Sequence, residues 1–198
     1  MGLDLDYNDG QTPIDEDEKE DLLIDSITNK SELDEFEQKN IEDAVEWSIP
    51  KKFSKNEILT EEFIKNVHKK MLGKVWKWGG KFRKSNKNIG VDWPNISTEL
   101  RKLLGDVGYW IENNTYSQDE IAIRFKHKLV SIHCFSNGNG RHSRLMADIL
   151  IKNVFEKEVF NWGGGDLINP GNARASYLTA IKEADRNSYE NLIQFARN

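Results

Sequence analysis

The 198-residue chain is predicted to fold as a single all-α domain. Apolar residues recur at intervals of three and four along most of the sequence, which is the spacing of helices that bury one face. No segment alternates apolar and polar residues for long enough to build a sheet. Hydrophobic residues make up 37% of the chain and aromatic residues 10%, so a packed core is expected and a disordered chain is excluded.

The N-terminal part of the chain divides into an acidic leader and one helix. Residues 1–25 are rich in Asp and Glu, and we expect this leader to be solvated and poorly ordered. Residues 26–50 contain a stretch of helical composition at 31–47, with Ser31 as its expected N-cap and Pro50 as its interruption. Residues 51–198 form the main domain.

The main domain is predicted to be a series of helices around one long loop. Apolar periodicity predicts helices at 60–72, 96–111, 117–132, 141–154, 172–185 and 188–197. Residues 76–95 have no helical period and are rich in Gly, Asn, Lys and aromatic residues, so they predict a loop with a short hairpin around Ile89 and Val91. A loop of this length is typical of a functional segment.

A dense polar segment, HCFSNGNGRHSR at 133–144, lies between two apolar helices. Gly138 and Gly140 permit positive φ angles, so the backbone N–H groups at this helix N-terminus can converge on one anion, usually a phosphate. Arg141 and Arg144 are three residues apart on the same helix face, and guanidinium groups match phosphate oxygens. These features predict a polyphosphate site.

His133 enters this segment from the preceding helix. An unperturbed imidazole has a pKa of about 6.5 and accepts a proton at neutral pH. A general base beside a polyphosphate site predicts group transfer from a nucleotide. By contrast, His142 has no role in this pattern, and we expect it to face solvent.

The pattern H-x-F-x-x-G-N-G-R-x-x-R resembles the signature of the Fic family. The matching residues are His133, Phe135, Gly138, Asn139, Gly140, Arg141 and Arg144. Similar segments occur at 68–83, 88–96 and 177–195, so the resemblance extends over most of residues 60–197. With the leader and the segment at 31–47 included, the chain is most similar to the subgroup called mobile mystery protein B, which implies a toxin-like role in a mobile element.

The resemblance implies an all-helical protein that moves AMP from ATP onto a Ser, Thr or Tyr hydroxyl of a target protein. In such a protein His133 would deprotonate the hydroxyl and Phe135 would anchor the core. The amides of residues 138–140 and the Asn139 side chain would hold the α- and β-phosphates. Arg141 would neutralise the β-phosphate, and Arg144 would bind the γ-phosphate.

The resemblance also implies that the loop at 85–96 is a flap, a hairpin that binds the target by strand addition. The residues expected to contact the target are Asn88, Ile89, Gly90 and Val91.

The position that usually carries the family's Mg²⁺-coordinating carboxylate is Asn137 in this chain. A neutral amide offers an oxygen but no charge, so the site for Mg²⁺ is expected to be weak. Two alternatives therefore stay open: a catalytically weak or inactive module that binds a nucleotide or a partner, and transfer of a different phosphate-containing group.

The family's inhibitory helix carries a Glu that pairs with the second arginine of the motif. The helix at 31–47 lies where an N-terminal version would be, and Glu37, Glu35 and Glu32 are the candidates, with Glu37 first. None has the complete inhibitory motif around it. A regulatory protein partner is the other form of control that we consider.

The remaining expectations are exclusions. A single cysteine, Cys134, excludes an internal disulfide and a Cys-based zinc site, and it fits a reducing compartment. No stretch approaches the roughly 18 apolar residues of a membrane helix, and no targeting segment is recognisable, so a cytoplasmic protein without membrane contact is expected. Nucleic acid is not an expected partner, because basic residues gather only at Lys81, Arg83, Lys84 and Lys87.

Overall fold

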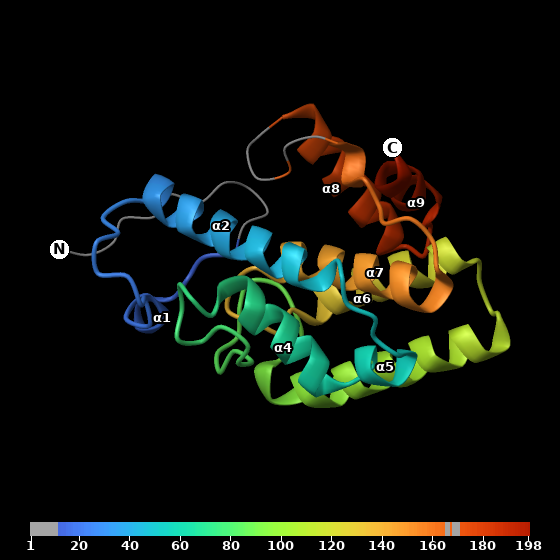
Figure 1. Cartoon of the computed structure of the whole chain (residues 1–198), viewed down its shortest axis with the longest axis horizontal. Coiled ribbons are helices and arrows are strands. Elements are labelled where there is room, and N and C mark those ends of the chain that lie inside the picture. Colours follow the sequence, from blue (N-terminus) through green and yellow to red (C-terminus); the bar gives the residue numbers. More distant parts are fainter. Residues whose placement is uncertain (1–11, 165–166, 168–170) are drawn as a thin grey trace.

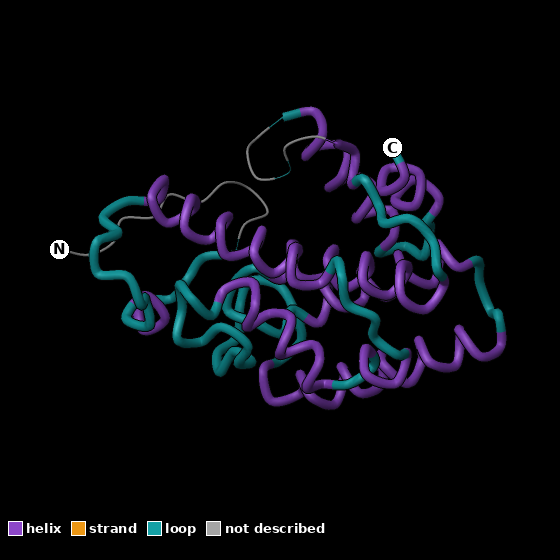
Figure 2. The backbone as a smooth tube through the Cα atoms, in the orientation of Figure 1, coloured by secondary structure: helices purple, strands orange, loops and turns teal. Residues whose placement is uncertain are grey.

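The computed structural model describes residues 12–164, 167 and 171–198, and within them the protein is all-α (Figure 1). These residues contain no β-strand (Figure 2), and an isolated antiparallel bridge joins Leu22 to Trp76. The predicted fold class is therefore confirmed. The helices are α1 (Glu16–Lys19), α2 (Lys30–Ser48), α3 (Lys55–Ile58), α4 (Glu61–Leu72), α5 (Ile96–Asn113), α6 (Gln118–Ile132), α7 (Asn139–Phe155), α8 (Asn172–Ala184) and α9 (Glu190–Arg197), with 3₁₀ turns η1 (Trp93–Asn95) and η2 (Trp162–Gly164).

Side-chain caps explain where several helices begin. The hydroxyls of Thr60 and Ser117 accept hydrogen bonds from backbone N–H groups in the first turns of α4 and α6. At α2 the cap is Asn29, whose side chain accepts from the Glu32 N–H, and not the expected Ser31. The short helices α1 and α3 each carry a capping box and were not predicted, because four residues contain too little of a helical period.

Helices α6 and α7 form the centre of the molecule. They pack against each other, and α5 and α9 contact α6 while α3 and α4 contact α7. α2 packs on α4 and lies across the other elements on one side of the molecule, and α8 packs on α9 at the other end (Figure 1). The loop at 133–138 joins the two central helices, so its polar residues lie at the middle of the fold.

The predicted hairpin around Ile89 and Val91 is wrong, since the loop between α4 and η1 forms no strand. The physical reason is the buried side chain of Arg83. Its guanidinium donates to the carbonyls of Ser85 and Val91 on the loop and to that of His133. Val91 also donates its backbone N–H to the carbonyl of Ile132. The polar groups that would form a hairpin ladder are therefore bonded elsewhere.

The part of the expected leader that the structure describes packs on the domain. Leu23 donates its backbone N–H to the carbonyl of Val75, and Lys77 donates to that of Asp21. The indole N–H of Trp78 donates to the carbonyl of Glu18 at 3.3 Å. Residues 1–11 of the leader lie outside the described residues. None of the helices described has the length and apolarity needed to cross a lipid bilayer.

Candidate functional site

A cavity of about 510 Å³ contains the polar groups of the 133–144 segment. Its walls come from the N-terminal segment, α2, the loop at 89–90, α6, the loop before α7, α7 itself and α8. His133, Asn137, Gly138, Asn139, Gly140, Arg141 and Arg144 all line it. The residues that the sequence predicts for the base and the phosphate site are therefore brought together. Phe135 is buried and does not line the cavity.

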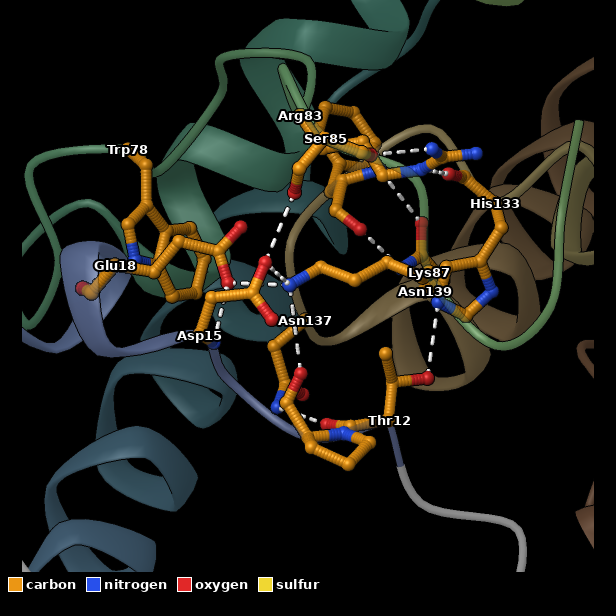
Figure 3. Close-up of polar contacts among 12 residues, drawn as sticks. Thr12, Asp15, Glu18, Trp78, Arg83, Ser85, Lys87, His133, Asn137 and Asn139 are labelled. Atoms are coloured by element: carbon orange, nitrogen blue, oxygen red, sulfur yellow. Dashed lines mark hydrogen bonds and ion pairs between the residues drawn. The ribbon is translucent and has the colours of Figure 1, made fainter. Parts of the chain in front are cut away.

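His133 ends α6 in a left-handed conformation, with φ of 57°. Its side chain is buried, and its Nε2 lies 3.0 Å from the Thr12 hydroxyl (Figure 3). Burial and, to a smaller extent, the charge of Arg83 together lower the pKa of His133 to about 4, although a backbone contact with Val130 opposes them. The imidazole is therefore neutral at pH 7, and its Nε2 faces the Thr12 hydroxyl.

The N-terminus of α7 lies beside His133 in the cavity. Gly138 precedes the helix with φ of 76°, and a Cβ there would lie 2.6 Å from Cδ1 of Leu72, so glycine is required. Gly140, the other glycine that could permit a positive φ, lies in the first helical turn instead, and a Cβ there would meet no atom within 4 Å. The first-turn N–H groups of a helix have no intrahelical acceptor, so this end of α7 can bind an anion.

The side chain of Asn139 shapes the loop that precedes α7. Its Oδ1 accepts from the Phe135 N–H at 3.0 Å, and its Nδ2 donates to the Phe135 carbonyl at 2.8 Å. Both polar atoms therefore close the loop before α7, and Nδ2 keeps a second N–H group that this contact does not use. Phe135 is fully buried, and its ring stacks on that of His68 with centroids 3.7 Å apart.

The two arginines of the motif have different surroundings. Arg141 Nη2 lies 2.7 Å from Glu37 Oε2, and the second oxygen of Glu37 accepts from the Trp76 indole N–H at 2.8 Å. Arg144 instead lies over the ring of Tyr177, 5.7 Å from its centroid. Glu37 is only 3% exposed, so this carboxylate is held inside the cavity by α2.

The other inhibitory candidates lie outside this cavity. Glu32 accepts hydrogen bonds from the backbone and side chain of Thr28 at the start of α2. Glu35 is exposed and does not line the cavity. Glu37 pairs with Arg141, the first arginine of the motif, whereas the resemblance implied a pair with the second, Arg144.

Both polar atoms of the Asn137 side chain form hydrogen bonds. Its Oδ1 accepts from the Gly138 N–H at 2.5 Å, and its Nδ2 donates to the Thr12 carbonyl at 3.4 Å. Among the described residues, no group of three or more His, Cys, Asp or Glu side chains is placed to hold a metal ion.

Two buried residues were missed or misjudged in the sequence, Lys126 at the cavity and His142 in α7. Lys126 is fully buried at the cavity, with its Nζ 4.7 Å from the Tyr177 ring centroid, and burial lowers its pKa. The expectation that His142 faces solvent is wrong, because its ring is buried and Nε2 lies 3.0 Å from the Ile64 carbonyl. Both residues lie on the buried face of their helix, and the helical spacing from their apolar neighbours could have predicted their burial.

The residues 58–151, which include α4 to most of α7, match the family model described as the Fic/DOC family. They form a Fic/DOC domain. The match begins near α4 and includes the whole segment from His133 to Arg144.

Two curated relatives support this assignment of the Fic/DOC domain. The protein adenylyltransferase Fic of Aedes aegypti is 33% identical over 102 residues, which cover 50% of this chain and 20% of that protein. The protein of the same name from Drosophila grimshawi is 28% identical over 141 residues, or 69% of this chain and 28% of the relative. The chain therefore spans less than a third of these relatives' length.

The fold of the chain also resembles solved structures. The BepC protein of Bartonella tribocorum superposes with a TM-score of 0.65 over 86% of this chain and 87% of that one. The two sequences are 17% identical, so the likeness concerns the fold.

Proposed function

We propose that this chain is a protein adenylyltransferase, which moves AMP from ATP to a Ser, Thr or Tyr hydroxyl of a protein. One observation carries the proposal: the neutral His133 ring and the N-terminus of α7 with its two arginines line the same cavity. The relatives named as protein adenylyltransferases support it, as does the binding of AMPPNP by the BepC protein of Bartonella tribocorum.

The proposed reaction uses these groups in fixed roles. His133 Nε2 takes the proton of the acceptor hydroxyl, whose oxygen attacks the α-phosphorus of ATP. A new P–O bond forms to the acceptor, the bond between the α-phosphorus and the bridging oxygen breaks, and pyrophosphate leaves. The first-turn amides of α7, Arg141 and Arg144 would neutralise the charge on the phosphates.

Magnesium, if it takes part, is proposed to be held mainly by the nucleotide. The amide oxygen of Asn137 carries no charge and already accepts a hydrogen bond from Gly138. Mg²⁺ commonly keeps several waters and binds substrate phosphates together with one or two carboxylates. The described residues supply no such carboxylate cluster, and we route no step of the reaction through the metal.

The loop at 88–91 is proposed to contact the protein target. Gly90 has φ of 105°, and a Cβ there would lie 2.6 Å from Cβ of His133, so the loop backbone passes directly beside the base. Ile89 is exposed at the rim of the cavity. Main-chain groups of Asn88, Ile89 and Gly90 would present a target hydroxyl to His133 without a requirement for particular side chains, whereas those of Val91 bind Ile132 and Arg83.

We also propose that Glu37 is inhibitory. Its bond to Arg141 occupies a guanidinium that the phosphates of ATP would use, so nucleotide binding requires this pair to open. The toxin-like role, the link to mobile elements and the cytoplasmic location stay predictions.

The test compares ATP labelled at the α-phosphate with ATP labelled at the γ-phosphate. We expect the α-label to enter protein and His133→Ala to reduce it by about 10²-fold or more. Equal labelling by the variant would show that His133 is not the base. Entry of the γ-label would favour transfer of a different group. ATP binding without transfer, followed by activity in Asn137→Asp, would favour the weak binding module.

A further inference from the structure

The N-terminal segment of the chain places its own hydroxyl on the proposed base. Thr12 Oγ1 lies 3.0 Å from His133 Nε2, and the Thr12 carbonyl accepts a hydrogen bond from Asn137 (Figure 3). Thr12 is buried, and it lines the same cavity as Arg141. A threonine hydroxyl therefore occupies the position in which an acceptor would lose its proton.

The loop that is proposed to hold a target holds this segment. Lys87 is central to the contact: its Nζ lies 2.7 Å from Asp15 and 2.6 Å from Glu18, and its side chain is only 3% exposed. Ser85 Oγ donates to Asp15 Oδ2 at 2.9 Å, and Lys87 Nζ lies 3.5 Å from the Pro13 carbonyl (Figure 3).

These contacts favour the charged form of Asp15. Burial raises the pKa of Asp15, but the hydrogen bonds from Lys87 and Ser85 and the charge of Lys87 outweigh it, so the pKa is lowered overall. The carboxylate is thus ionised when it binds Lys87. A buried ammonium with two carboxylate partners fixes the backbone just after Thr12.

We infer that Thr12 is an acceptor of AMP in cis, so that the enzyme's first protein substrate is its own N-terminal segment. The inference rests on the proposed function. The Thr12 hydroxyl proton passes to His133 Nε2, and Oγ1 forms a bond to the α-phosphorus of ATP. The bond from that phosphorus to the bridging oxygen breaks, and pyrophosphate leaves with the electron pair.

The other hydroxyls of the cavity are less suited to this step. Among the described residues, Ser131 and Tyr177 also line the cavity. Ser131 Oγ donates to the carbonyl of His127 in its own helix at 2.9 Å. Tyr177 is buried between the side chains of Lys126 and Arg144. Neither forms a hydrogen bond with His133, whereas Thr12 does.

The experiment incubates the full chain with ATP and Mg²⁺ and locates AMP by peptide mass spectrometry. Wild type and Glu37→Gln are compared with Thr12→Val, which removes the hydroxyl at nearly constant volume, and with Thr12→Ser, which keeps it. Thr115→Val is the matched control, because Thr115 is exposed and does not line the cavity. A cell lysate is added in a parallel arm.

We expect AMP on Thr12 in wild type or Glu37→Gln, its loss by at least tenfold in Thr12→Val, its retention in Thr12→Ser, and no change in Thr115→Val. The fraction modified per minute should not depend on protein concentration, since the reaction is intramolecular. A rate that rises with concentration would overturn transfer in cis.

The remaining outcomes separate this inference from the proposed function. AMP on lysate proteins or on other residues, with Thr12 unmodified, would overturn the inference and leave the adenylyltransferase intact. Thr12→Val would then raise that labelling if the segment only blocks the site. No AMP on any protein, even with Glu37→Gln, would overturn both.

Discussion

Glu37 Oε2 lies 2.7 Å from Arg141 Nη2, although the two residues are 104 positions apart in the chain. The pair joins α2 to the first turn of α7, where the proposed phosphate site begins. Because an arginine bound to a buried carboxylate must give up that partner before it can bind phosphate, α2 competes with the nucleotide.

Glu37→Gln is expected to tighten nucleotide binding by about tenfold, equivalent to about 1.4 kcal/mol. Glutamine keeps an oxygen for the Trp76 indole but carries no charge to hold Arg141. Calorimetry with a non-hydrolysable ATP analogue measures the effect. Glu35→Gln is the matched control, because this exposed residue lies on the same helix. Unchanged or weaker binding in Glu37→Gln would contradict the competition.

The pKa of His133, lowered to about 4, predicts that the ring stays neutral well below pH 7. Burial and the charge of Arg83 disfavour the imidazolium, so acid is needed to protonate it. The Cε1–H resonance of His133, assigned by comparison with His133→Ala, should titrate with a midpoint near pH 4. A midpoint of about 6 or higher, as in an exposed histidine, would argue against this environment.

Asp148 is expected to make the protein less stable as pH rises. Burial raises its pKa to about 7, and the hydrogen bonds from Trp162 and Phe160 only partly oppose this. The folded state binds the proton more tightly than the unfolded state, whose pKa is 3.8. The stabilisation from this proton is therefore complete below about pH 4 and is lost as pH rises to about 7.

Asp148→Asn measures this effect, since asparagine does not titrate. The free energy of unfolding of the variant minus that of wild type should increase between about pH 4 and pH 7, by up to about 1.4 kcal/mol per pH unit. Urea unfolding at several pH values provides the numbers, and the contributions of the histidines cancel in the difference. A difference that is flat or falls with pH would mean that Asp148 is ionised in the folded protein.

Arg83→Lys is expected to destabilise the protein by about 2–4 kcal/mol, although it keeps the charge. The guanidinium binds the carbonyls of Ser85, Val91 and His133, and an ammonium cannot reach three acceptors in that fork. Thermal or urea unfolding measures the loss. Arg101→Lys is the control, because Arg101 is exposed and binds a carbonyl of its own helix. Similar small effects of both variants would refute the special role of Arg83.

Asn137→Asp is expected to make ATP binding more dependent on Mg²⁺. A carboxylate at this position gives the cation a charged oxygen, so the ratio of ATP affinities with and without Mg²⁺ should rise on the order of tenfold. Titrations of ATP in Mg²⁺ and in chelator give the ratio. Asn137→Ala, which provides no oxygen, should leave the ratio unchanged, and the same rise in both variants would exclude metal ligation as its cause.

The helices of the fold were predictable because their apolar stripes are local patterns. Ile121, Phe125, Leu129 and Ile132 recur along α6, and all are buried. The same logic, applied to polar residues, would have found His142, which precedes Leu145 and Met146 by three and four positions. Its polarity suggested solvent, but the helix period places it on the buried face.

The convergence of His133, Gly138 and Arg141 was predictable as well, since one short segment carries them all. The contacts of Thr12 with His133 and of Lys87 with Asp15 were not, because they join residues 121 and 72 positions apart, and no local pattern specifies such a pair. The loop at 85–96 was predicted to form a hairpin because its sequence does not reveal that the Arg83 side chain binds the carbonyls of Ser85 and Val91.

The stacked indoles of Trp76 and Trp78, with ring centroids 4.9 Å apart, have an optical consequence. The Trp76 N–H is bonded to Glu37 in α2, and the Trp78 N–H to the carbonyl of Glu18, at the end of the segment that begins at Thr12. Release of either contact changes the surroundings of one ring in a coupled pair. Near-ultraviolet circular dichroism and tryptophan fluorescence would therefore follow both N-terminal contacts in real time, without an added dye.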